Sequence, residues 1–97
     1  MKMVIRKHTW DRWPQRGGNT KHLNSIKASR HLQAALAAGV TNNPEDYPME
    51  AGGIICREGV IVYIDDGLWG VFTPELSGKW AMVTALGIKE LTERGYI

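Results

Sequence analysis

The sequence predicts a small single domain of the α+β class: a helix, a three-stranded antiparallel meander and a C-terminal helix, with a further N-terminal strand. Three observations predict it. The chain has 97 residues, of which 43% are hydrophobic and 23% charged, as in an ordinary globular domain. Three β-branched and aromatic runs follow one another with short glycine-containing turns between them. Amphipathic helical patterns flank these runs on both sides.

We expect one domain over residues 1–97, with a basic strand and loop segment at 1–18 and an α-β-β-β-α core at 19–97. Residues 3–10 alternate imperfectly between two faces, which predicts the extra strand. Pro14 favours an extended residue before it, and Gly17-Gly18 indicates a loop.

The first core helix is predicted to end at Gly39, a residue suited to the position after a helix C-terminus. Asn24 is one of several residues before it that can cap its N-terminus. At 100° per residue one face is apolar, and the other is basic in its first half, where Lys27 and Arg30 lie. The apolar face consists of Ala28, Leu32, Ala35 and Leu36.

The meander is predicted over residues 54–57, 60–64 and 68–72. Residues 60–64 are apolar on both faces, which indicates a central strand that is covered on each side. Between Gly39 and the meander, residues 43–46 resemble a capped helix start that Pro48 limits to about one turn.

Residues 79–84 fit a helix and a strand equally well, and a helix over residues 88–94 is stopped by Gly95. The single cysteine, Cys56, excludes an internal disulfide and reads as a small buried side chain. We predict a core that includes Leu32, Leu36, Ile55, Val60, Val62, Ile64, Val71, Trp80, Val83 and Leu91.

The order α-β-β-β-α resembles that of double-stranded-RNA-binding domains. In that family the second helix opens with a lysine-rich phosphate clamp. The corresponding segment here, residues 77–80, holds one lysine. The resemblance therefore covers the order of elements and not the residues that bind phosphate.

Charge is unevenly distributed along the chain. Residues 1–33 hold eight Lys/Arg and one acid, a net charge of +7, whereas residues 34–97 hold four Lys/Arg and nine acids, a net charge of −5. Such asymmetry favours a polyanionic partner, or ion pairing between the two halves.

The best candidate for a functional segment is the basic and aromatic stretch at residues 6–16, extended by the cations that follow it. Arginine and lysine neutralise phosphates, and an exposed tryptophan can stack on a base. Buried tryptophan anchors are the alternative. The predicted nucleic-acid-binding residues are Arg6, Lys7, Trp10, Arg12, Trp13, Arg16, Lys21, Lys27 and Arg30.

We predict no metal site, no cofactor and no catalytic residue. The three histidines, at positions 8, 22 and 31, lack the spacing of zinc ligands. Asp65-Asp66-Gly67 lacks the calcium-loop pattern and is typical of a turn.

The leading hypothesis is a small non-enzymatic binding module whose basic N-terminal third contacts nucleic acid. One alternative is a protein-binding inhibitor or accessory factor of a phage-type mobile genetic element. It would act by occluding a macromolecular partner, and that partner would present an acidic protein surface. Another is a small metal-independent ribonuclease toxin. With no apolar run long enough to cross a bilayer, we expect a cytoplasmic protein without a membrane partner, and self-association stays open.

Overall fold

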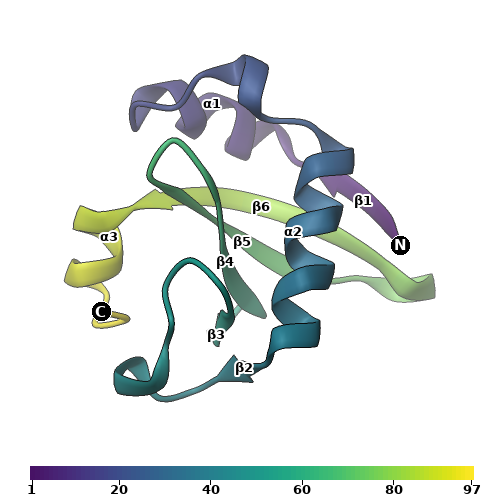
Figure 1. Ribbon diagram of the computed structural model, residues 1–97. Helices are drawn as coiled ribbons and strands as arrows, with labels where there is room; N and C mark the ends of the chain where they lie inside the picture. Colours follow the sequence, from purple (N-terminus) through teal and green to yellow (C-terminus); the bar gives the residue numbers. More distant parts are fainter.

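Six strands form one mixed sheet in the computed structural model, which describes all residues from Met1 to Ile97 (Figure 1). The strands are β1 (Lys2–Ile5), β2 (Val40–Thr41), β3 (Gly53–Ile55), β4 (Val60–Asp65), β5 (Leu68–Pro74) and β6 (Lys79–Gly87), in the order β1-β6-β5-β4-β3-β2. The pairs β1–β6 and β2–β3 are parallel, and the other neighbours are antiparallel. The α+β class is confirmed.

The predicted meander corresponds to β3, β4 and β5, and two features extend it. Residues 79–87 form a strand, so the antiparallel part of the sheet has four strands rather than three. Strands β1 and β2 then add in parallel at opposite edges. Since residues 79–80 begin a strand, the resemblance to the order of a double-stranded-RNA-binding domain ends there.

Three helices accompany the sheet: α1 (Lys7–Gln15), α2 (Ser25–Ala38) and α3 (Ile88–Glu93). Helix α2 lies across one face of the sheet (Figure 1). Its predicted end at Gly39 is confirmed, and Gly39 has a φ of +117°. Of the candidate caps at its N-terminus, Asn24 is the one whose side chain accepts a hydrogen bond from the Lys27 amide, at 2.8 Å. Single turns of 3₁₀ helix occur at Thr20–His22, Pro44–Asp46 and Leu76–Gly78. None of these helices has the length and apolar character needed to cross a bilayer.

Helix α1 is the main correction to the sequence prediction. The predicted strand over residues 3–10 ends at Ile5, and a helix over residues 7–15 replaces its second half and the residues that follow. Thr9 and Trp13 lie four residues apart and are both buried, so a helix packs the two on one face. The prediction of an extended residue before Pro14 is wrong, because Trp13 and Pro14 both lie in the helix, where Pro14 removes the hydrogen bond that its own amide would have donated.

Helix α1 also covers the edge of β6 where β1 stops. The four residues of β1 pair only with residues 79–82 of β6. At that point the Arg6 amide and the Thr9 hydroxyl both donate to the Met82 carbonyl, at 3.0 and 2.8 Å. The Arg16 guanidinium donates to the Ala85 carbonyl further along the strand. These donors satisfy carbonyl groups that a longer β1 would have paired.

The core has one cluster on each face of the sheet. Six predicted core residues are buried: Leu32, Val60, Val62, Ile64, Val71 and Leu91. The structure corrects the other four, since Leu36 and Ile55 are 38% and 46% exposed and Trp80 and Val83 are only partly buried. Cys56 is half-buried. Ala28, Leu32 and Ala35 form the face of α2 that packs against the sheet. Leu36 lies at the margin of that face.

Candidate functional site: a basic cleft beside α2

Ion pairs between the halves of the chain balance three of the eight lysine and arginine charges of the N-terminal third. Four basic side chains of the N-terminal third each contact an acid from the C-terminal half. This is the second of the two explanations that the sequence left open. The pairs are Arg6–Glu75, with nitrogen–oxygen distances of 2.8 and 2.6 Å, Arg16–Glu90 at 3.1 Å, His22–Asp66 at 2.8 Å, and Lys27–Asp65.

Trp13 is not a stacking platform. Its side chain is completely buried in the core cluster, and its indole N–H donates to the Asn19 carbonyl at 2.9 Å. Gly18 packs against this indole, so this glycine leaves room for the protein's own core rather than for a ligand. Trp10 is 39% exposed on the outer part of α1.

The remaining predicted residues fall into two groups. On α1, Lys7 is highly exposed and forms only a long pair with Asp11 at 3.7 Å, while Arg12 donates to a glutamine on the same helix at 2.7 Å. Lys21 is exposed in the turn before α2, and Lys27 and Arg30 lie on α2 itself. The nine residues therefore do not form one continuous surface.

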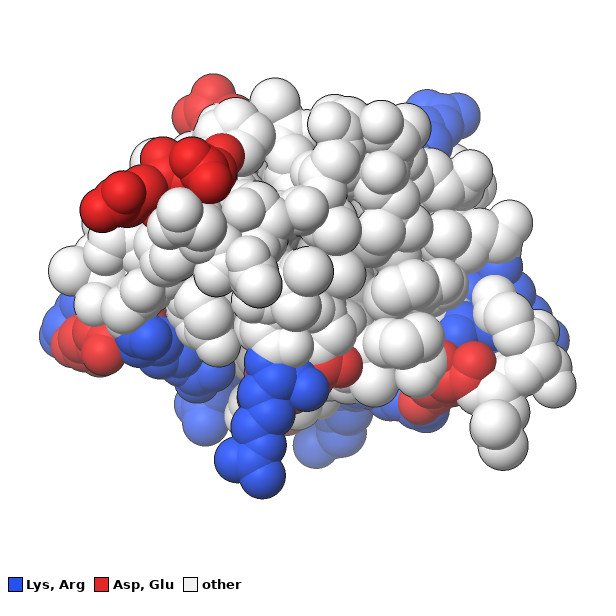
Figure 2. Space-filling model, turned by 90° about the horizontal axis from the view of Figure 1, so that it is seen from below, with Lys and Arg blue, Asp and Glu red and all other residues white.

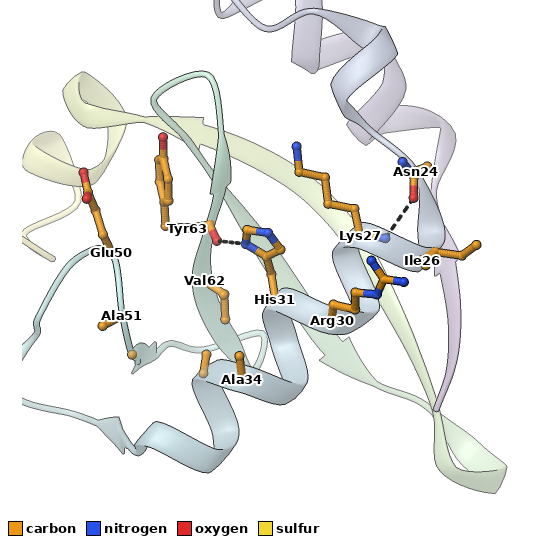
Figure 3. A pocket seen from close by; sticks show the side chains of 12 residues that line it. Asn24, Ile26, Lys27, Arg30, His31, Ala34, Glu50, Ala51, Val62 and Tyr63 are labelled. Carbon is orange, nitrogen blue, oxygen red and sulfur yellow. Dashed lines mark hydrogen bonds between the residues drawn. The ribbon is translucent and has the colours of Figure 1, made fainter.

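Lys27 and Arg30 line the largest hollow in the molecule, a cleft of about 970 Å³ between α2 and residues 50–52, above β4 (Figure 3). The α2 wall is basic, the opposite wall is acidic, and small apolar side chains form much of the rest. The polar side chains are Asn24, Lys27, Arg30, His31, Glu50 and Tyr63, and the apolar ones include Ile26, Ala34, Ala35 and Val62.

The helical repeat explains why these groups meet. With Ala28, Leu32 and Ala35 packed against the sheet, Lys27 and His31 lie four residues apart on the flank of α2 that faces the cleft. Alanines at positions 34 and 35 leave space where larger side chains would fill it. The opposite wall turns sharply at Met49, whose φ is +55°.

His31 is held in a defined orientation. Its Nδ1 atom lies 3.0 Å from the carbonyl oxygen of Tyr63. A carbonyl can only accept, so Nδ1 carries the proton, and Nε2 is the nitrogen that accepts or releases a proton. Arg30 is exposed and forms no ion pair. It is therefore free to bind an anion at the cleft.

A second polar cluster adjoins the cleft at the β4–β5 turn. The donor atoms of His22, Asp65 and Asp66 lie within 4.8 Å of one another. The hydrogen bond from Lys27 lowers the pKa of Asp65, and the amide of Asn19, followed by the His22 imidazole, lowers the pKa of Asp66. These carboxylates are already paired with the protein's own donors, so we assign the cluster a structural role in fastening α2 to the sheet.

Seen from below, the molecule presents a broad uncharged area, with charged side chains around its margins (Figure 2). The C-terminal end of α2 and strand β2 lie on this side, with exposed Leu36, Ala37, Ala38 and Val40. Because this area has no cations to contact phosphates, the contacts that a polyanion needs lie elsewhere.

Sequence reasoning missed His31 and Glu50. The spacing of Lys27 and His31 on one helical flank was a usable signal, whereas nothing in the sequence places Glu50 across from them. The candidate site thus rests on geometry and charge. In comparisons with protein-family models, with curated proteins and with solved structures, nothing matches this chain.

Proposed function

We propose that this protein binds single-stranded nucleic acid through the cleft beside α2. The observation that carries the proposal is an unpaired, exposed arginine, Arg30, beside Lys27 and His31 at a concave site with an apolar lining. Arginine and lysine bind phosphate, and the apolar lining supplies a surface for a base or a sugar.

The shape of the site favours a single strand over a duplex. A cleft of about 970 Å³ is at the upper end of the range for small-molecule sites, which is roughly 300–1,000 Å³. A flexible strand can insert a nucleotide into such a cleft, whereas the bases of a duplex stay stacked outside it. Because Lys27 is shared with Asp65, Arg30 carries the largest part of the phosphate contact.

The cations of α1 offer a separate, secondary contact. Lys7 lies one helical turn from the partly exposed Trp10, and Arg12 lies on the same helix, which is not the helix that lines the cleft. They add electrostatic attraction without base readout, so we expect little sequence preference.

The test is the fluorescence anisotropy of a labelled ten-nucleotide strand, titrated with protein at several salt concentrations. Three phosphate contacts predict a log–log salt slope of roughly −2 on a single strand. Arg30→Ala should weaken binding about tenfold at low salt, because it removes the unpaired cation. The matched control is Arg57→Ala, which removes an exposed arginine on the β3–β4 turn, away from the cleft. Equal affinity of the two variants, or no binding by the unaltered protein at low salt, contradicts the proposal.

A further inference from the structure

We infer that the cleft cleaves RNA, with Glu50 as the general base and His31 as the general acid. The inference rests on the proposed function, because the substrate is the strand held by Arg30. Figure 3 shows the Glu50 side chain across the cleft from the His31 ring, with Tyr63 between them. One cleft thus offers two proton-transferring groups on opposite walls.

The three histidines of the chain differ in what holds them. His22 Nδ1 contacts the Asp66 carboxylate, and His8 is exposed on α1. His31 alone lines the cleft, and its Nδ1–H is held by the Tyr63 carbonyl. That carbonyl accepts the Nδ1–H and fixes the orientation of the ring, which leaves Nε2 as the site of proton exchange.

Cleavage by the neighbouring 2′-hydroxyl needs a base, an acid and cations at the phosphate. The Glu50 carboxylate accepts the 2′-hydroxyl proton while the 2′-oxygen attacks phosphorus. The new 2′-O–P bond forms, the P–O5′ bond breaks, and His31 Nε2–H protonates the leaving 5′-oxygen. The products are a 2′,3′-cyclic phosphate and a 5′-hydroxyl, and solvent returns the two side chains to their starting states.

Arg30 and Lys27 stabilise the charge that builds on the phosphoryl oxygens during attack. Both lie on the same wall as His31, so an anion bound there is next to the acid. Positioned cations of this kind stabilise the transition state more than the ground state. The substrate class that this chemistry requires is ribonucleic acid, because deoxyribose lacks the attacking hydroxyl.

The experiment compares a labelled RNA ten-mer with a DNA strand of the same sequence, each incubated with excess protein across pH 5–8. We expect RNA fragments that end in 2′,3′-cyclic phosphate, a bell-shaped dependence of rate on pH, and intact DNA. His31→Asn and Glu50→Gln should each slow cleavage at least 100-fold. The affinity of both variants for the DNA strand should stay within about twofold of the unaltered protein. His8→Asn is the matched control and should cleave normally.

Each failure has a separate meaning. Intact RNA despite normal DNA binding overturns the cleavage inference and leaves the binding proposal standing. If the unaltered protein does not bind the DNA strand, both the binding proposal and the cleavage inference are overturned. Undiminished cleavage by His31→Asn, with a circular dichroism spectrum like that of the unaltered protein, overturns the assignment of His31.

Discussion

Replacement of Gly18 by alanine is a sharp test of how α1 packs onto the sheet. An added Cβ at this position would lie 2.5 Å from Trp13 Cδ1 and 2.7 Å from Leu68 Cδ1. Ordinary carbon–carbon contacts are about 3.5–4.0 Å, so something must move by about 1 Å. The indole cannot swing aside, because it is completely buried and its N–H is bonded to Asn19. Overpacking of this kind costs roughly 1–3 kcal/mol, and we expect a value in the upper half of that range.

The adjacent glycine provides the control. Gly17 has a φ of +91°, and an added Cβ there would meet nothing within 4 Å. Gly17→Ala therefore costs only the backbone strain of a left-handed residue, about 1 kcal/mol. In thermal unfolding followed by circular dichroism, 1 kcal/mol shifts the melting temperature by about 4–8 °C in a domain of this size. Gly18→Ala should lower it by about 8–24 °C. A smaller shift for Gly18→Ala than for Gly17→Ala would refute the packing described here.

Two more predictions concern the ion pairs. Arg16→Met should destabilise the domain by about 1–3 kcal/mol in urea unfolding, because it removes the cation that pairs with Glu90 and the side-chain donor to the Ala85 carbonyl of β6. Arg12→Met should change the stability by less than about 0.5 kcal/mol, and equal effects of the two variants would contradict this. Asp66→Asn should lower the melting temperature at pH 7. The hydrogen bond from the Asn19 amide is the main cause that holds the pKa of Asp66 below its usual value of about 3.9. The stabilisation that the Asp66 carboxylate gives to the fold is therefore present above that pH and is lost as the pH falls through the lowered pKa. The variant and the unaltered protein should therefore converge in acid, and a constant difference down to pH 2 would count against the pairing.

The parts of the fold that could be predicted from sequence are those where one local signal dominates. Gly39 marks the end of α2, and the two-sided apolar run of β4 indicates a central strand. Helix α1 escaped prediction because its buried face contains only Thr9 and Trp13. Two inward residues four apart, with Pro14 beside them, do not separate a helix from irregular alternation.

The segment at residues 79–87 shows the complementary difficulty. Its apolar residues fit both a helical and a strand period. Only pairing with β1 and β5 on its two sides makes the segment a strand. This pairing is long-range, so no local pattern encodes it. The ends of the sheet are equally non-local, since β2 contributes only Val40 and Thr41.

For the candidate site, sequence identified cations but not their environment. Arg6 and Arg16 proved to be fastened to Glu75 and Glu90, while Arg30 remained free. Nothing in a linear charge count separates a paired arginine from an unpaired one. Glu50 was equally inaccessible, because it reaches the cleft from a long loop.

The parallel pairing of β1 with β6 has a consequence for the order in which the molecule forms. Residues 2–5 hydrogen-bond in the sheet only to residues 79–82, so β1 leaves the ribosome long before its partner β6 has been made. The acids that neutralise Arg6 and Arg16 also come late in the chain. Docking of β6 therefore pairs β1, fixes α1 at the sheet edge and brings Arg6 and Arg16 to their acidic partners in one late event. We expect the nascent chain to gain resistance to proteolysis abruptly once residue 87 has emerged, rather than in gradual steps.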